Sequence, residues 1–208
     1  MSDDDAAVVA ALRRGDEAAF ASLIERYQAS LLRLAKAYVA TPEQAEDAVA
    51  ETWLGVLHGI DRFEGRSSLR TWIFRILVNR AKTKGVREHR SVPFSALEGG
   101  GDDPEPAVDP ERFRDGAWSA PPASWEGIPE ERLLGAETRA VVEAAIAALP
   151  ETQRAVITLR DVRGFTALET CEALDITEAN QRVLLHRARS KVRARLEDYL
   201  GPAEPSAV

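Results

Sequence analysis

A tract rich in Pro, Gly, Asp and Glu interrupts the sequence from Ser91 to about Glu130. It contains three consecutive glycines at 99–101 and two adjacent prolines at 121–122, and such runs cannot sustain a helix. We interpret this tract as a linker. A chain of 208 residues divided in this way is expected to form two small domains, one on each side of the linker.

The residues before the linker follow the period of amphipathic helices. Apolar side chains recur at helical spacing across 20–38, and a second helix is predicted to begin at Thr41, where a Thr-Pro-Glu-Gln sequence can form a capping box. The buried face of this second helix is expected to include Trp53 and Leu57. A third helix is predicted to begin at 67–68, and no period-two strand pattern occurs in this part of the chain.

The residues after the linker predict further helices. Helical stripes cover 141–149 and 152–160, and a capping box at Thr166 begins a short helix that runs through Leu174. A three-residue connection then leads into a long helix from 178 to 199. A short helix, a tight turn and a longer basic helix match a helix-turn-helix, whose second helix enters the major groove of DNA. Many helix pairs with short turns are plain hairpins, so the topology alone leaves both interpretations open.

Charge is distributed unevenly along the chain, although its net value is −7. Residues 62–90 carry nine basic and two acidic groups, whereas 91–137 carry three and eleven. In the predicted last helix basic side chains crowd together, and no acidic residue occurs from Ala179 to Leu196. One run of arginines by itself is as well explained by a solvated helix face. Two basic patches separated by an acidic tract favour binding to nucleic acid.

The first basic patch combines cations, hydroxyls and aromatic rings. Polar residues spaced three or four apart share one face of the predicted third helix: Thr71, Arg75, Asn79 and Lys82. Cations beside stacking rings suit single-stranded or unstacked bases, and Asn and Arg can read base edges. Periodicity favours a core position for Trp72, whereas Phe63 is compatible with either a core or a stacking role.

Composition disfavours several other classes of protein. No stretch approaches the roughly 20 apolar residues that a bilayer requires, and the first residues are acidic, unlike a secretory signal. The one cysteine and three scattered histidines predict neither a disulfide nor a metal site, and a reducing cytoplasmic location fits them. Cys171 lies between Leu168 and Leu174, which favours a buried structural role over redox sensing. We expect no cofactor.

Two blocks of the sequence resemble the extracytoplasmic-function (ECF) group of bacterial RNA polymerase sigma factors. The first block covers Ala45–Trp53 and Phe63–Asn79 and is similar to region 2 of that family. The second runs from Leu149 to Arg189, with Leu-Arg-Asp-Val-Arg-Gly-Phe-Thr at 159–166, and is similar to region 4. Both blocks occur in the family's order with a linker between them. Together they cover most of the chain outside 91–130.

The resemblance implies a dissociable, non-enzymatic subunit that gives core RNA polymerase its promoter specificity. The expected fold is all-α. It has a region 2-like domain at 1–90, a flexible acidic linker at 91–132, a region 4-like helix-turn-helix domain at 133–200 and a disordered tail at 201–208. The implied partners are core polymerase and promoter DNA, duplex at the −35 element and melted at the −10 element. An anti-sigma factor is a further candidate partner, and no membrane insertion is expected.

Roles for individual residues also follow from the resemblance. The helix from Ala45 to Leu57 would dock on core polymerase through Asp47, Glu51 and Trp53. The residues assigned to the −10 element, where an extruded base would be captured, are Phe63, Arg66, Ser67, Ser68, Arg70, Thr71, Arg75, Asn79 and Arg80. Those assigned to the −35 element are Arg163, Thr166, Asn180, Arg182, Val183, His186, Arg187 and Arg189. Positions 182, 183, 186 and 187 share one face of the last helix, while Leu185, Val192 and Leu196 can point inward.

Some positions depart from the family pattern. Ala50 stands where the family often has Gln, which removes one polar contact with polymerase. The last helix begins with Ala179-Asn180-Gln181 where the family often has Gly-Thr. Asn and Gln can both pair with adenine, which would alter the −35 preference; alternatively, Asn180 caps the helix. The linker is long for this group, and by analogy it would thread toward the RNA-exit path of polymerase.

Two other functions compete with this one. A stand-alone helix-turn-helix regulator would bind duplex DNA without polymerase and would use its first domain for sensing or dimerisation. The basic patch in the first domain favours the sigma factor instead. An enzyme could use Asp47 and Glu51 as a carboxylate pair, but no His, Cys or phosphate-binding glycine loop accompanies them.

Overall fold

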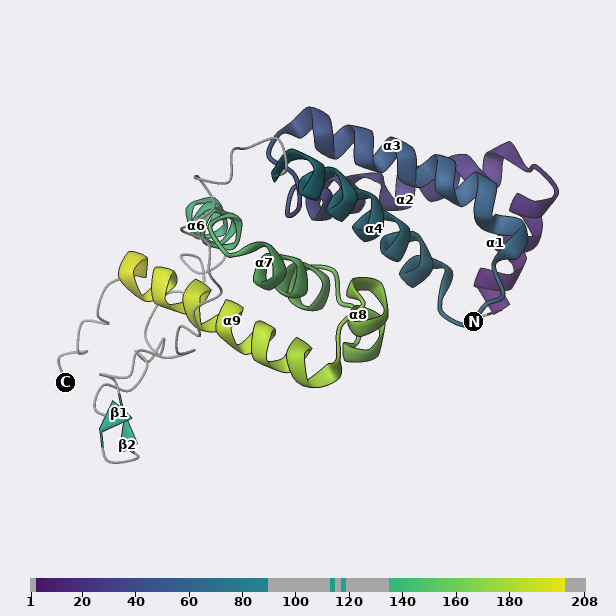
Figure 1. The fold of residues 1–208 in the computed structure, drawn as a ribbon. Helices are drawn as coiled ribbons and strands as arrows, with labels where there is room; N and C mark the ends of the chain where they lie inside the picture. The colour runs from purple at the N-terminus through teal and green to yellow at the C-terminus, as the bar shows by residue number, and fades with distance from the viewer. Residues whose placement is uncertain (1–2, 90–112, 115–116, 119–134, 201–208) are drawn as a thin grey trace.

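The structure is a computed structural model that describes residues 3–89, 113–114, 117–118 and 135–200. The helices before the linker are α1 (Asp3–Arg13), α2 (Glu17–Ala35), α3 (Pro42–Gly59) and α4 (Leu69–His89), with the 3-10 helix η1 (Ile60–Arg62) between α3 and α4. Those after it are α6 (Ala136–Ala147), α7 (Glu151–Ile157), α8 (Ala167–Leu174) and α9 (Glu178–Leu200), with a π-helical turn η4 (Thr158–Val162) after α7. Figure 1 shows two groups of helices that meet where α4 approaches α8. The predicted all-helical architecture is confirmed for the two domains.

Side-chain caps fix where several helices begin. Asp16 accepts hydrogen bonds from the backbone N–H groups of Ala18 and Ala19 at the start of α2. The predicted capping boxes at Thr41 and Thr166 are both present. These side chains satisfy N–H groups that have no partner within the first turn of a helix. The sequence therefore carries the start signals of α2, α3 and α8 locally.

The core of the first domain lies between α2, α3 and α4, which each contribute fully buried aliphatic side chains: Leu31, Val49 and Leu77. Two glycines let α3 approach α4 closely. A Cβ at Gly55 would lie 3.0 Å from Cγ2 of Ile76, and one at Gly59 would lie 3.1 Å from the ring of Trp72. A side chain at either position would therefore push the two helices apart or displace its neighbour.

The second domain contains the predicted pair of a short and a long helix. Helix α8 is followed by its C-cap Asp175, whose φ of 57° places it in the left-handed region. Helix α9 begins after Thr177, whose hydroxyl accepts a hydrogen bond from the Asn180 N–H. Thr177 therefore caps the helix, and the alternative that Asn180 does so is wrong. Phe165 is buried just before α8 and anchors the pair.

The predicted linker, 91–132, lies mostly outside the described residues, as the predicted tail at 201–208 does entirely. Within the linker, β1 (Phe113–Arg114) pairs antiparallel with β2 (Ala117–Trp118), with Phe113 opposite Trp118. This two-residue hairpin departs from an all-α fold. None of the helices in the described ranges combines the length and the apolar character that a membrane-spanning segment requires.

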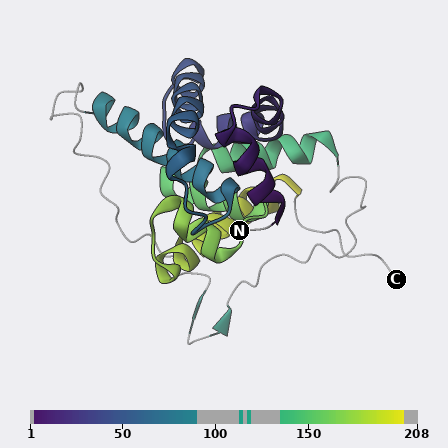
Figure 2. The ribbon, with the colours of Figure 1, turned by 90° about the vertical axis from the view of Figure 1, so that its right-hand side faces the viewer.

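The two domains contact each other through aromatic and polar side chains. The rings of Phe74 on α4 and Phe165 lie with their centroids 5.0 Å apart. Across the same junction, Lys82 donates a hydrogen bond to the carbonyl of Leu174 at 3.2 Å. Arg154 on α7 donates to the carbonyl of Ala37 at 2.9 Å. In both Figure 1 and Figure 2, α8 lies beside α4. We call this arrangement, in which the two domains are in contact, the closed arrangement.

Candidate nucleic-acid interface

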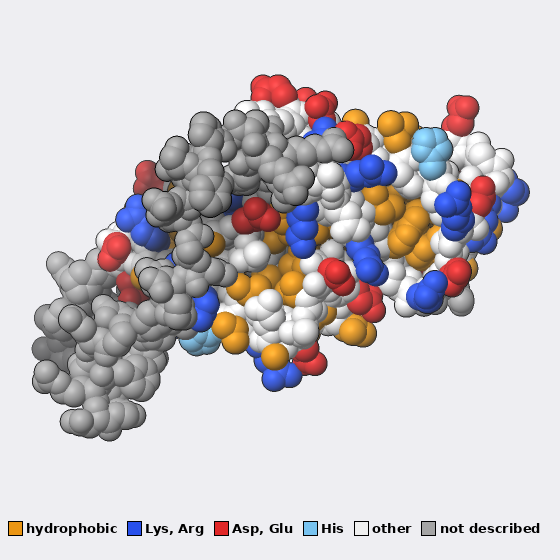
Figure 3. Space-filling model, in the orientation of Figure 1, with side chains coloured by type: hydrophobic (Ala, Val, Ile, Leu, Met, Phe, Trp, Pro, Cys, Tyr) orange, Lys and Arg blue, Asp and Glu red, His pale blue; other side chains and the backbone are white. Residues whose placement is uncertain are grey.

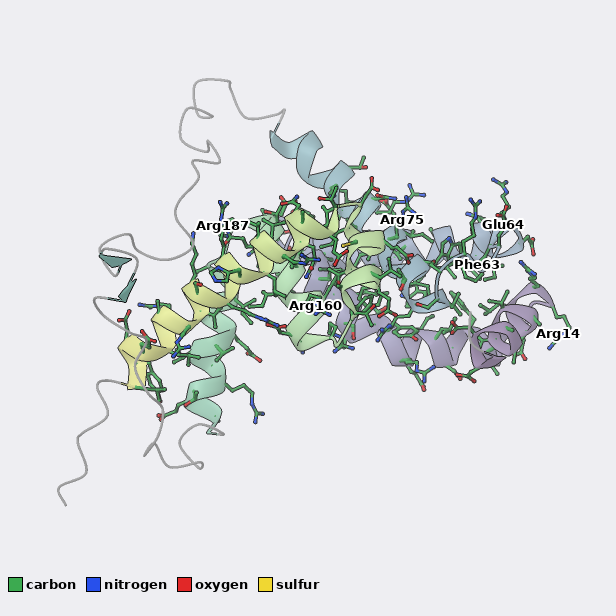
Figure 4. The ribbon with its side chains drawn as sticks, turned by 90° about the horizontal axis from the view of Figure 1, so that it is seen from below. Arg14, Phe63, Glu64, Arg75, Arg160 and Arg187 are labelled. Carbon is green, nitrogen blue, oxygen red and sulfur yellow. The ribbon has the colours of Figure 1, made fainter. Side chains whose placement is uncertain are left out.

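A cavity of about 350 Å³ lies where the loop after η1 meets α4. Phe63 and Trp72 form one wall, with their ring centroids 4.9 Å apart. Phe63 is buried, so it belongs to the core and supports the cavity from within. The remaining lining is polar: Arg62, Glu64, Arg66, Ser67, Thr71, Arg75 and Glu172. Figure 4 shows Phe63, Glu64 and Arg75 at this end of the domain. An apolar wall beside cations suits an unstacked base and its phosphate.

Two of the predicted −10 residues hold the start of α4. Ser68 Oγ accepts a hydrogen bond from the Thr71 N–H at 3.1 Å, and the two hydroxyl oxygens lie 2.8 Å apart. Thr71 is only 1% exposed, so its part is to support the loop. By contrast, four cationic or amide side chains are exposed and accessible: Arg66, Arg75, Asn79 and Arg80. Ser67 is half-buried.

Arg70 faces the second domain. Its Nη2 donates to both carboxylate oxygens of Glu169 on α8, at 2.9 and 3.0 Å. Its guanidinium carbon lies 4.1 Å from the ring centroid of Phe165, a cation–π geometry. The predicted −10 residue Arg70 is therefore held by the helix-turn-helix domain in this structure. A second cavity of about 400 Å³ adjoins this contact.

Glu169 has a lowered pKa because of its partners. Partial burial by itself raises the pKa of this carboxyl, but the Thr166 N–H, the Arg70 guanidinium and the Thr166 hydroxyl donate to it and outweigh that effect. Glu169 is thus shared between the capping box of α8 and the contact with Arg70. Glu172, one turn further along α8, lines the cavity beside Arg75. Two acidic side chains of the second domain therefore face the first basic patch.

The outer face of α9 carries the second candidate surface. Arg182, Val183 and His186 are exposed, and Arg187 is half-buried. Leu185 and Val192 are buried, as predicted for the inner face of this helix, and Leu196 is half-buried. Figure 4 shows Arg187 on α9, well separated from Phe63 and Arg75. The helix therefore offers a mixed cationic and apolar strip of the kind that lies in a major groove.

Several predicted DNA-contacting arginines already have carboxylate partners. Arg182 binds Glu178 at 2.6 Å, and Arg189 binds Asp161 through two hydrogen bonds. The hydrogen bond that Arg182 donates to Glu178 raises the pKa of Arg182. Arg163 is different, because burial and then the like charges of Arg33 and Arg70 lower its pKa. That crowding of cations marks Arg163 as a residue that an anion would stabilise.

The start of α9 corrects one expectation. Gln181 is only 2% exposed, so it cannot read adenine in a groove. Asn180 is exposed and remains available. Thr166, predicted near phosphates, uses its hydroxyl in the capping box of α8.

Helix α3 presents an acidic and apolar outer surface. Asp47 and Glu51 are accessible, and both form ion pairs with Lys84. Its Nζ lies 3.5 Å from Oδ2 of Asp47 and 3.0 Å from Oε1 of Glu51. Trp53 is 7% exposed and donates to Gln28 at 2.7 Å, so it can support a docking surface without touching a partner. Leu57 was expected to be buried, but it is 48% exposed. Together with exposed Leu54, which was not predicted to be buried, it forms an apolar strip on the outer surface.

Cys171 is half-buried, so the expected fully buried position is not observed. Its neighbour Leu168 is exposed, because this face of α8 points outward. Burial is the largest cause of the raised pKa of the Cys171 thiol. A raised thiol pKa lowers the thiolate fraction and argues against a reactive cysteine.

Basic side chains are interleaved with exposed apolar ones over the first domain, as Figure 3 shows. Sequence analysis missed α1, whose Asp5 and Arg13 contact the two ends of the loop around the first cavity. It also missed the acidic face of α8. The helical spacing of Val8, Val9 and Leu12 is the signal that could have revealed α1.

Comparison with known proteins places both candidate surfaces within matched regions. Residues 23–91 match the family model of Sigma-70 region 2, and residues 139–192 match that of Sigma-70, region 4. The ECF RNA polymerase sigma-E factor of Escherichia coli (strain K12) is 31% identical over 188 residues, which cover 90% of this chain and 92% of the relative. The sigma-E factor of Haemophilus influenzae is 28% identical over 196 residues, covering 94% and 97%.

Two solved structures share the fold. CnrH, in complex with the cytosolic domain of CnrY, matches with a TM-score of 0.58 and 22% identity, over 94% of this chain and 99% of that one. The sigma factor RpoE from Bartonella quintana, in complex with the anti-sigma factor NepR, matches with a TM-score of 0.55 and 21% identity, over 87% and 96%.

Proposed function

This chain belongs to the ECF sigma factors of RNA polymerase, which direct transcription initiation, and from that premise we propose how it divides promoter recognition between its two domains. Sigma factors are not catalysts, so the chemistry to explain is selective binding. The partners of this chain are core RNA polymerase and promoter DNA. In this proposal residues 1–90 engage polymerase and the −10 element, and residues 133–200 engage the −35 element.

The −10 proposal rests on the cavity between Phe63 and Arg75, which is the observation that carries the whole assignment. An extruded base would enter it and stack near the Phe63 and Trp72 wall. Arg66 and Ser67 at its rim would contact the base or its phosphate. The exposed residues along α4 would then guide the opened strand: Arg70 once released from Glu169, Arg75, Asn79 and Arg80. Phe63, Ser68 and Thr71 would shape the site.

The −35 proposal rests on the outer face of α9. His186 and Val183 are exposed on the strip that would meet base edges, with Arg182, Arg187 and Asn180 beside them. Arg163, Thr166 and Arg189 would meet phosphates, Arg163 once the domains separate and it no longer lines the second cavity. The Arg182–Glu178 and Arg189–Asp161 pairs would exchange their carboxylates for phosphates on binding.

Docking on polymerase would use the outer surface of α3. Asp47 and Glu51 would exchange Lys84 for cations of polymerase, and exposed Leu54 and Leu57 would add apolar contact. The acidic tract at 91–132 would connect the domains along the RNA-exit path, with 201–208 as a free tail. Because both solved relatives hold a partner chain, an anti-sigma protein is a further proposed partner. A cytoplasmic location accords with these roles.

The two domains must separate for this function. Elements near positions −35 and −10 are about 25 base pairs apart, which is roughly 85 Å at about 3.4 Å per base pair. A compact chain of this length has a radius of gyration of about 17 Å. The closed arrangement, in which Arg70 binds Glu169, therefore cannot reach both elements at once. Opening would also free Arg70 for the DNA strand.

Run-off transcription with purified bacterial core polymerase tests the proposal. Genomic promoter fragments are transcribed with the wild-type chain, with Arg75→Gln and with the control Lys36→Gln, an exposed cation at the end of α2. Discrete starts that depend on the chain, weakened by Arg75→Gln alone, are expected. No starts, together with footprints on duplex DNA by the chain alone, would favour the stand-alone regulator.

A further inference from the structure

Helix α1 contacts both ends of the loop that forms the proposed −10 cavity. At the beginning of the loop, Arg13 reaches back to main-chain carbonyls. Its Nε donates to Ile60 at 3.3 Å, and its Nη2 donates to Phe63 at 2.7 Å and to Asp61 at 3.4 Å. One guanidinium thus holds three carbonyls within four consecutive residues.

At the end of the loop, an acidic residue of the same helix accepts a hydrogen bond from the main chain. Asp5 Oδ2 accepts a hydrogen bond from the backbone N–H of Leu69, the first residue of α4, at 3.2 Å. That N–H has no partner within its own helix. Asp5 therefore caps α4 from a position 64 residues away in the sequence.

The charges of α1 match the helix ends that they touch. Arg13 meets the carbonyl-rich end of α3 and η1, which carries partial negative charge, and Asp5 meets the N-terminus of α4, which carries partial positive charge. The two residues are eight positions apart in the helix, a rise of about 12 Å. That fixed spacing sets the distance between the two ends of the loop.

Helix α1 is itself held in place. Val9 and Leu12, between the two contact residues, are buried in the core of the domain. The turn after α1 is closed by Gly15, whose φ of 76° suits glycine, and by the Gly15 N–H bond to the carbonyl of Leu12. A rigid helix with one contact at each end can hold the loop between them in one shape.

We infer that α1 braces the base-capturing loop, with Arg13 and Asp5 as positioning residues that sharpen selection of the −10 sequence. The inference rests on the proposed role of that loop. A pocket that must accept one extruded base gains selectivity when its walls are fixed before binding. Without the contacts of Arg13 and Asp5, the main chain at Phe63 and the start of α4 can shift. The pocket then accepts other bases with a smaller free-energy penalty.

The test uses the full chain assembled with bacterial core polymerase. Its probe is a pool of fork-junction DNAs with a randomised duplex upstream arm and a randomised single-stranded overhang. Bound molecules are sequenced, which yields separate preferences for the overhang and for the duplex. The variants are Arg13→Gln, Arg13→Lys and Asp5→Ala, and the matched controls are Arg14→Gln and Asp4→Ala, neighbouring residues of the same charge.

Arg13→Gln and Asp5→Ala each remove at least one of these hydrogen bonds and are expected to lower overhang enrichment about threefold to tenfold, while duplex enrichment stays unchanged. Arg13→Lys should restore part of the selectivity, since one ammonium can reach a carbonyl but not all three. The controls should match wild type. Thermal unfolding of each variant accompanies the selection.

Equal loss of overhang and duplex enrichment would overturn the inference, because it would indicate general destabilisation. Unchanged enrichment in Arg13→Gln and Asp5→Ala would overturn it too. The loop variant Arg66→Gln with Ser67→Ala separates this failure from failure of the proposed function. If the loop variant changes overhang preference and the α1 variants do not, only the brace is wrong. If the loop variant also has no effect, the −10 assignment is wrong, and so is the role of α1 that rests on it.

Discussion

The ion pair between Arg70 and Glu169 is expected to restrain binding of this chain to core polymerase. If the domains must separate before polymerase engages both, only the open fraction binds, and any change that favours opening raises the apparent affinity. Glu169→Gln removes the charge that holds Arg70. It should keep the capping box with Thr166, because glutamine also serves at that box position.

The magnitude follows from the geometry of the pair. Two hydrogen bonds of 2.9 and 3.0 Å join side chains that are 32% and 22% exposed. Exposed ion pairs contribute up to about 1 kcal/mol, and buried hydrogen bonds to charged groups contribute about 1.5 to 3 kcal/mol. Solvent screening at this exposure places the pair at about 1 kcal/mol, which changes a two-state ratio about fivefold.

The assay is a fluorescence titration of core polymerase with labelled chain in the absence of DNA, so that direct DNA contacts of Arg70 play no part. Glu169→Gln and Arg70→Gln should each bind about fivefold more tightly than wild type. Arg70→Gln removes the contact with Phe165 in addition to the bond that both variants lose, so the double variant should bind no more tightly than Arg70→Gln alone. Glu143→Gln, an exposed residue on α6, serves as the charge control.

Wild-type affinity in Glu169→Gln would refute this reasoning. Additive effects in the double variant would refute it as well, since they would mean that Arg70 and Glu169 act through separate partners. A fivefold gain in the Glu143→Gln control would attribute the effect to net charge instead of the contact.

Three further results are expected. Since the pKa of Glu169 is lowered, its ion pair with Arg70 is fully formed above the ordinary carboxyl pKa near 4.5 and is lost as the pH falls through the lowered pKa. Below that pH, wild-type and Glu169→Gln chains should have the same radius of gyration in X-ray scattering. Asp175→Gly removes the steric strain of a side chain in the left-handed region after α8. It should raise the free energy of unfolding in urea by about 0.5 to 1 kcal/mol. His186→Ala should weaken duplex preference at one or two positions by about 1 kcal/mol in the fork-junction selection, with overhang preference unchanged.

Features that depend on neighbouring residues were predictable from the sequence. The capping boxes at Thr41 and Thr166 and the turn before α9 are local, because each cap and its partner lie three residues apart. The same holds for the inward side chains Leu185 and Val192, which follow from helical period alone.

Features that depend on long-range contact were not predictable. The apolar stripe of α3 is wider than the surface that α2 and α4 cover, so periodicity counted Leu57 as core although it is exposed. Arg70 and Glu169 are 99 residues apart, and each has a sufficient local explanation, as a cation of the basic patch and as a member of a capping box. Nothing in either pattern states that the two side chains meet.

Two of the contacts that close the junction between the domains end on main-chain oxygen. Lys82 and Arg154 bind the carbonyls of Leu174 and Ala37, and most substitutions at those two positions would leave the acceptor in place. Related sequences can therefore drift at the acceptor positions without losing the bond, and these pairs should leave no trace of correlated substitution. Arg70 and Glu169 meet side chain to side chain, so coordinated change during evolution is expected at that pair.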